Sequence, residues 1–186
     1  MKRIILIVII STFLIITGCG YYSMAGSIPP HIKSIAIPLV NNQTAEFGIA
    51  ENITDNIIEV FNEENILRIV AEGNADSILR GTIISLDDAP YTFSSEEAVS
   101  EYRINITMEI TWLDVENETE LLKKRYSGWG AYGLSGDTNS DGIDNDGDGK
   151  IDDEDDDEFG EPRSFATKIA ITKIAEEIVN NILTSW

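Results

Sequence analysis

The sequence predicts an α+β fold, a two-layer sandwich with two helices packed on one face of a mostly antiparallel sheet of four to five strands. Three observations predict it: two amphipathic helical patterns, one long run of alternating side chains with a return strand behind it, and the order β-α-β-β-β-β-α. Strands with one apolar and one polar face need a helical layer over the apolar face.

The N-terminal half begins with a strand and a helix. The strand is expected over residues 34–40, where apolar side chains alternate and Pro38 marks an edge position or the end of pairing. Residues 41–44 form a polar turn. An amphipathic helix follows, with apolar residues at helical spacing. These residues are Ile49, Ile53, Ile57, Val60 and Phe61.

Three further strands come next. Residues 67–71 form a short apolar run, and residues 76–86 form a longer β-favouring run that ends at the turn signal of residues 87–90. The clearest pattern in the chain covers residues 102–112, where apolar and polar side chains alternate at period two. This third strand therefore has one buried and one solvated face.

The C-terminal half completes a hairpin and adds the second helix. Residues 114–120 form a polar turn and residues 121–132 return as a partner strand, with an expected aromatic and glycine-rich tip. The tip aromatics are Tyr126, Trp129 and Tyr132. Ser164 is expected to cap the last helix. Its apolar face contains Ile171, Ile174, Ala175, Ile178 and Ile182.

The N-terminus has the pattern of a bacterial lipoprotein signal. Lys2 and Arg3 precede an apolar segment, residues 4–16, that is too short to span a bilayer of about 30 Å. The segment closes on the lipobox Ile16-Thr17-Gly18-Cys19, so Cys19 is expected to carry covalent lipid and to become the first mature residue. Two or more acyl chains give lasting attachment. The alternative is an uncleaved anchor helix or a secretory signal with an incidental cysteine.

These features predict the domain organisation. Cys19 is the only cysteine, so the folded part relies on its apolar core without disulfides. Gly20 resembles the residue that permits export to the outer membrane. The expected parts are a signal peptide (1–18), a lipidated tether (19–30), the α+β domain (31–136 and 160–186) and an acidic insert (137–159).

Charge and composition exclude several function classes. The formal net charge is −20, and thirteen acidic residues stand against Lys150 between Asp137 and Glu161. No basic stripe suggests nucleic-acid binding. His31 is the only histidine and has no evident nucleophile beside it, so we expect an ordinary surface residue and a protein that is not an enzyme.

The acidic insert contains two overlapping frames of a calcium loop. Each frame has oxygen ligands at positions one, three and five and a glycine at position six, namely Gly142 and Gly149. The frames resemble thrombospondin type 3 and dockerin calcium repeats. The candidate ligands are Asp137, Asn139, Asp141, Asp144, Asp146, Asp148, Asp152 and Asp155. The alternative is a solvated acidic loop.

Several short motifs resemble the LptE family of lipopolysaccharide-assembly lipoproteins. They are Cys19-Gly20-Tyr21, residues 29–38, Asn42-Gln43-Thr44 and residues 75–81. The resemblance implies a lipid-anchored protein of a Gram-negative outer membrane, facing the periplasm or a barrel lumen. Such a protein plugs and helps assemble the LptD β-barrel and contacts lipopolysaccharide. The acidic insert departs from the family.

The basic triplet Lys123, Lys124 and Arg125 is the candidate contact for lipopolysaccharide phosphates. A solvated strand face is the alternative for these residues. The tip aromatics would suit a barrel wall or acyl chains, although such residues are more often core. Two other functions stay open. The strand and turn at residues 35–44 also resemble curli-secretion and penicillin-binding-protein-activator lipoproteins, which recruit periplasmic partners, and the insert would suit a calcium-dependent adhesive module.

Overall fold

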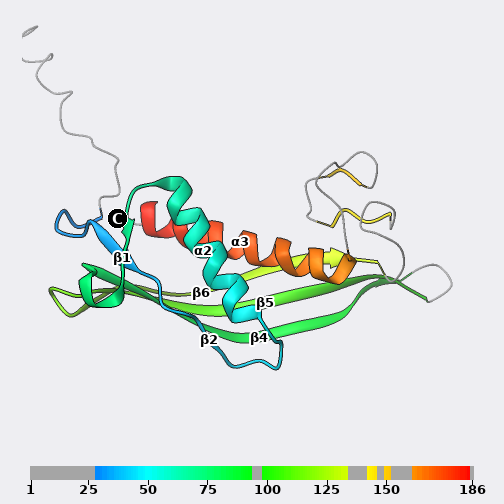
Figure 1. Cartoon of the computed structure of the whole chain (residues 1–186). Helices are drawn as coiled ribbons and strands as arrows, with labels where there is room; N and C mark the ends of the chain where they lie inside the picture. The colour runs from blue at the N-terminus through cyan, green and yellow to red at the C-terminus, as the bar shows by residue number, and fades with distance from the viewer. Residues whose placement is uncertain (1–27, 94–97, 134–141, 146–148, 152–160, 185–186) are drawn as a thin grey trace, which may run out of the picture.

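The computed structural model describes residues 28–93, 98–133, 142–145, 149–151 and 161–184, and its helices lie against a long, twisted sheet (Figure 1). In chain order, the elements are β1 (Ser34–Ala36), β2 (Asn41–Asn42), α2 (Ile49–Glu64), β3 (Arg68–Ile69), the 3-10 turn η1 (Glu72–Asn74), β4 (Ser77–Phe93), β5 (Val99–Asp114), β6 (Thr119–Tyr132) and α3 (Pro162–Thr184). The predicted α+β architecture is confirmed.

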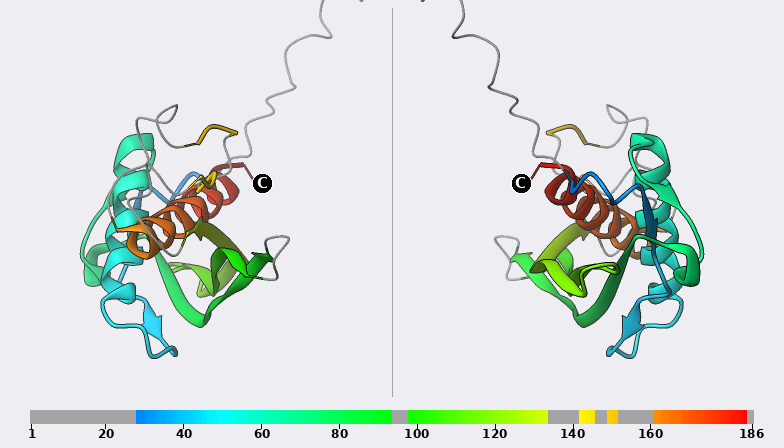
Figure 2. Two further views of the ribbon diagram at one scale, coloured as in Figure 1. Left: turned by 90° about the vertical axis from the view of Figure 1, so that its right-hand side faces the viewer. Right: turned by 90° about the vertical axis from the view of Figure 1, so that its left-hand side faces the viewer.

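The sheet is mixed, with the strand order β3-β1-β4-β5-β6. The short strand β1 runs parallel to both β3 and β4, whereas β4, β5 and β6 form a long antiparallel meander. Figure 2 looks along the sheet and shows both helices on the same side of it. The two-layer prediction is therefore correct, and the sheet has six strands where four to five were expected.

The sixth strand is β2, which lies where a polar turn was predicted. Asn41 and Asn42 pair in parallel with Thr82 and Ile83 of β4. The side chain of Asn42 closes the turn that follows, because its Oδ1 accepts the backbone N–H of Thr44 at 2.8 Å. The backbone of the two asparagines is then available to the sheet, which the polar composition of the segment did not reveal.

Two other strand boundaries differ from prediction. Strand β1 ends at Ala36, before Pro38, and so is shorter than expected. Strand β4 continues through residues 87–90, where a turn was predicted. The partner β5 is long enough to pair with this stretch, and register shifts on both sides of Thr92 accommodate the nearby proline.

The core lies between the helices and the inner face of the sheet, as the amphipathic patterns predicted. Helix α2 buries the side chains of Ile49, Ile53, Ile57 and Phe61. All five residues of the predicted apolar face of α3 are buried as well. From the sheet, Leu79, Ile83, Ile104, Ile106, Met108, Ile110 and Trp112 face them. The hydrophobic effect therefore holds the two layers together.

The glycines of β6 let α3 approach the sheet closely. An added Cβ at Gly128 would lie 2.1 Å from the carbonyl oxygen of Ala170, and one at Gly130 would lie 2.1 Å from that of Ala166. The predicted turn at residues 114–120 is confirmed, since β5 ends at Asp114 and β6 begins at Thr119, and the glycines predicted as a tip at the end of the returning strand lie within β6. The glycines serve helix packing and not a turn.

Helix α3 begins two residues before the predicted cap. Pro162 takes its first position, which suits proline because that residue needs no N–H there. Ser164 lies inside the first turn and donates its backbone N–H to Oε2 of Glu161 at 2.7 Å. Hydrogen bonding to the Ser164 side chain, followed by this backbone bond, lowers the pKa of Glu161. Glu161 therefore performs the capping role expected of Ser164.

Candidate functional site

The solvated, helix-free face of the sheet carries two of the three predicted basic residues. Lys123 lies opposite Thr111 of β5, and Arg125 lies opposite Glu109. Both side chains are largely exposed, at 52% and 71%, and each has a nitrogen 3.8 Å from a carboxylate oxygen of Glu109. Ion pairs this exposed and this long are weak, so both cations stay available to a ligand.

Lys124 faces the helical layer instead. It lies opposite the buried Ile110. Its Nζ is 3.0 Å from Oε1 of Glu177 and 3.1 Å from Oδ1 of Asn181, both on α3. Successive residues of a strand point to opposite faces, so a triplet in a strand cannot form one cluster.

A further cation of the helix-free face is Arg80 of β4. It lies opposite Thr111, in the same cross-strand row as Lys123. Two strand spacings, about 10 Å in total, therefore separate the backbones of Arg80 and Lys123. The guanidinium of Arg80 pairs with Glu72 and is exposed. Sequence reasoning missed this residue because only the register of β4 against β5 brings it beside β6.

The aromatic residues of β6 divide between core and surface. Tyr126 and Tyr132 are buried, and burial raises the pKa of Tyr126 to about 12. Trp129 is half-buried on the other face. The guanidinium carbon of Arg103 lies 4.0 Å from the Trp129 ring centroid, and Nζ of Lys173 lies 4.1 Å from it. These cation–π contacts fix the Trp129 ring beside two cations.

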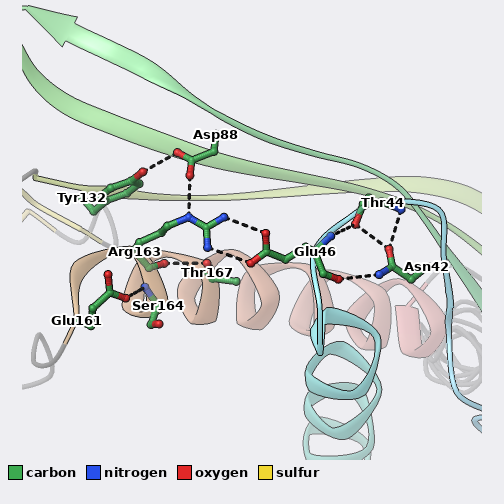
Figure 3. Close-up of polar contacts among 9 residues, drawn as sticks. All are labelled: Asn42, Thr44, Glu46, Asp88, Tyr132, Glu161, Arg163, Ser164 and Thr167. Carbon is green, nitrogen blue, oxygen red and sulfur yellow. Dashed lines mark hydrogen bonds and ion pairs between the residues drawn. The ribbon is translucent and has the colours of Figure 1, made fainter.

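Arg163 ties four elements of the fold together (Figure 3). Its two terminal nitrogens bind both carboxylate oxygens of Glu46 at 3.0 Å, and its Nε donates to Oδ2 of Asp88 at 2.8 Å. Asp88 also accepts the hydroxyl of Tyr132 at 2.7 Å. The hydrogen bonds from Arg163 are the main reason that the pKa of Glu46 is lowered. This network joins α3, β4, β6 and the segment before α2.

The only histidine is paired, contrary to the expectation of an ordinary surface residue. Nε2 of His31 lies 2.7 Å from Oδ2 of Asp114, whose side chain is 2% exposed. Asn117 also donates its side-chain N–H to Asp114 at 2.8 Å, and this bond contributes most to the lowered pKa of that aspartate. The start of the domain is thereby attached to the β5–β6 turn.

Only a small part of the acidic insert lies within the described residues. Asp144 is the one candidate calcium ligand among them, and its Oδ2 accepts the backbone N–H of Gly149 at 3.1 Å. Gly142 and Gly149, the predicted position-six glycines, have φ angles of 72° and 97°. No group of three or more potential metal-ligating side chains occurs among the described residues.

The remaining predicted sites lie outside the described residues. These are the lipidation residue Cys19 and the other seven candidate ligands, Asp137, Asn139, Asp141, Asp146, Asp148, Asp152 and Asp155.

Asn145, within the insert, is fully buried against the edge of β6. Its side-chain N–H donates to the backbone carbonyl of Ala131 at 2.8 Å, and its backbone carbonyl accepts the N–H of Ala131 at 3.1 Å.

Comparison with solved structures finds proteins that are similar to this chain over most of its length. A protein from Xanthomonas campestris, XCC0632, superposes with a TM-score of 0.53 at 11% identity, covering 85% of this chain and 90% of that one. A minor lipoprotein from Acinetobacter baumannii gives 0.48 at 12% identity, covering 84% and 95%. A lipoprotein from Caulobacter crescentus gives 0.45 at 11% identity, covering 78% and 89%. Comparison with curated protein sequences finds no match.

Comparison with protein-family models identifies the family of this chain. The class is that of lipopolysaccharide-assembly proteins. The family model described as "LptE: Lipopolysaccharide-assembly" matches residues 32–185, and the chain belongs to the LptE family. Among the described residues, no helix is both long and apolar enough to cross a membrane.

Proposed function

We propose that this lipopolysaccharide-assembly lipoprotein is held in the outer membrane by lipid on Cys19, plugs an LptD-type β-barrel, helps it assemble and contacts lipopolysaccharide without enzymatic activity. The observation that carries the proposal is the family match over residues 32–185, which includes every described strand and helix. The long meander of β4, β5 and β6 provides a rigid, mostly polar face that suits a protein held inside a hydrated lumen.

The helix-free face is the part that we assign to lipopolysaccharide. Lys123, Arg125 and Arg80 bring three cations to one surface, and Lys123 and Arg125 share only one long contact partner, Glu109. Phosphate groups accept hydrogen bonds from lysine and arginine, and arginine binds them with two parallel bonds. The face therefore matches the phosphorylated part of an anionic glycolipid better than its acyl chains.

Replacing both Lys123 and Arg125 with glutamine is expected to weaken lipopolysaccharide binding roughly fivefold at low salt, because exposed charge pairs contribute little each. The effect should shrink as ionic strength rises. Binding of purified lipopolysaccharide to the immobilised protein measures both. Lys124→Gln is the matched control, since Lys124 faces α3. Equal affinity of the double variant and the wild type would contradict this assignment.

Protease accessibility separates the plug from the other two functions. A barrel plug should resist added protease in intact outer membranes, whereas a lipoprotein that recruits a periplasmic partner should be cut from the periplasmic side. A calcium-dependent adhesin should lose its partner in chelator. Rapid cleavage of the membrane-bound chain would contradict the plug.

We also propose that the insert at residues 137–159 binds calcium. The supporting observation is the Asp144 to Gly149 hydrogen bond, which joins positions one and six of the second predicted loop. Both position-six glycines have the positive φ that side chains disfavour. Calcium takes six to eight oxygen ligands, and extracytoplasmic modules bind it with dissociation constants of about 10⁻⁴ to 10⁻³ M.

Adding calcium should therefore protect the insert from protease and change the circular dichroism of the protein, because the ion cancels repulsion among the carboxylates. Asp144→Ala should abolish the protection. Asp87→Ala, on the solvated end of β4, removes the same charge elsewhere and should leave the protection intact. A protease pattern that calcium does not alter would contradict calcium binding.

A further inference from the structure

Phe47 stands out on the surface because its side chain is 100% exposed. It lies in the segment between β2 and α2. Leaving a phenyl ring wholly in water forgoes the stabilisation that its burial would give. A partner that covered this ring would regain the stabilisation that its burial gives.

The segment that carries Phe47 is held firmly in place (Figure 3). The side chain of Asn42 donates to the carbonyl of Glu46 at 2.9 Å and accepts the N–H and the hydroxyl of Thr44, each at 2.8 Å. The Glu46 carboxylate is bound at both oxygens by Arg163. The residue before Phe47 is therefore fixed at its backbone and its side chain, so a partner would meet a preorganised anchor.

Phe47 lines a groove between the two helices. The groove has a volume of about 500 Å³ and runs between the first turns of α2 and α3, with Asn52 and Asp55 on one wall and Thr167 and Lys168 on the other. A shallower hollow lined by Asp55, Ile58, Glu59, Asn62 and Glu63 continues it along α2. The two hollows adjoin at Asp55 and Glu59.

The exposed side of α2 is acidic along its whole length. Glu51, Asp55, Glu59 and Glu63 follow one another at four-residue spacing, all four are exposed, and the helix contains no basic residue. Like charges four residues apart destabilise a helix. The arrangement opposes helix stability, and it favours a positively charged partner.

We propose that Phe47 and the acidic side of α2 beside it form a docking surface for a basic segment of a partner polypeptide, with Phe47 inserted into an apolar pocket of that partner. Charge complementarity identifies the occupant, because the four carboxylates on the exposed side of α2 attract lysine and arginine and repel an anionic glycolipid. The cations on the facing wall are Arg163, which is already paired with Glu46 and Asp88, and Lys168. The surface lies on the helical layer, away from the basic residues of the sheet, and the proposal does not depend on the barrel.

A photoreactive phenylalanine analogue in place of Phe47, in the lipidated full-length protein in cells, tests this proposal. We expect one predominant adduct, to a peptide of positive net charge from another polypeptide. Changing Glu51 and Glu59 to glutamine and Asp55 to asparagine should lower the yield at least fivefold. The matched control changes Glu116, Glu118 and Glu120 of the β5–β6 turn to glutamine and should leave the yield unchanged.

The same analogue at Phe93, which is 61% exposed at the end of β4, controls for exposure alone and should not give this adduct. An adduct with lipid, with a second copy of this chain or with a neutral or acidic peptide would overturn the proposal. So would the lack of any adduct, or a yield that the charge changes on α2 do not alter.

Discussion

Gly130→Ala is expected to destabilise the domain by about 3 kcal/mol, at the upper end of the cost of overpacking a core. The new Cβ would lie 2.1 Å from the Ala166 carbonyl oxygen and 2.7 Å from its Cα. Both atoms belong to the backbone of α3, so no flexible side chain can move aside. The helix would have to lift from β6, which loosens the packing of its buried face.

Urea unfolding of the chain from residue 20 onward, followed by circular dichroism, measures this effect. Gly73→Ala is the control, since nothing lies within 4 Å of a Cβ there. That variant should stay within about 0.5 kcal/mol of the wild type. If Gly130→Ala unfolds at the same urea concentration as Gly73→Ala, then α3 does not contact β6 as closely as described.

Arg163→Ala should cost about 2 kcal/mol, because three charge-assisted hydrogen bonds are lost and two neighbouring carboxylates remain without their cation. The Arg163 side chain is 37% exposed, so solvent screening keeps the value below that of a buried pair. Arg125→Ala removes an arginine that is 71% exposed and should change stability by no more than about 0.5 kcal/mol. Equal stabilities of the two variants would contradict the structural role of Arg163.

Acid unfolding provides a second test of the same network. Arg163 holds the pKa of Glu46 below its ordinary value of 4.5. A carboxyl group with a lowered pKa in the folded state adds stability above its unfolded pKa, and this stability is lost as pH falls through the folded value. The wild type should therefore lose stability more steeply below about pH 4.5 than Arg163→Ala. Parallel acid limbs would show that the Glu46 carboxylate gains nothing from Arg163.

Much of the fold followed from periodicity. The alternation of residues 102–112 corresponds to β5, and the helical spacing around Ile53 and Ile174 corresponds to buried faces of α2 and α3. What periodicity does not contain is register. The strand at Asn41 and Asn42 exists because β4 has a free edge there. A parallel pairing of two residues produces no periodic pattern in the sequence.

The glycines show how one signal can have two physical causes. Gly128 and Gly130 were predicted to form a tip at the end of the returning strand. In the structure they remove side chains where α3 crosses the strand, and Ala166 and Ala170 are small for the same reason. The small residues of α3 and β6 match in size, and that pairing was the available clue.

The candidate site was predictable only in part. Alternation along β6 already implies that Lys124 points away from Lys123 and Arg125, whereas the arrival of Arg80 on their face depends on pairing across three strands. Phe47 carries no signal in the sequence, since its exposure results from the hydrogen bonds of Asn42 and Arg163 around it. Long-range contacts decide such surfaces, and local patterns do not encode them.

The most direct test of the barrel function is affinity purification of the lipidated protein, tagged after Trp186, from detergent-solubilised outer membranes. Mass spectrometry then identifies and quantifies the proteins that co-elute. A large β-barrel protein at equal stoichiometry is the result that the plug predicts. Recovery of only soluble periplasmic proteins or peptidoglycan synthases would contradict it and would favour a lipoprotein that recruits a periplasmic partner.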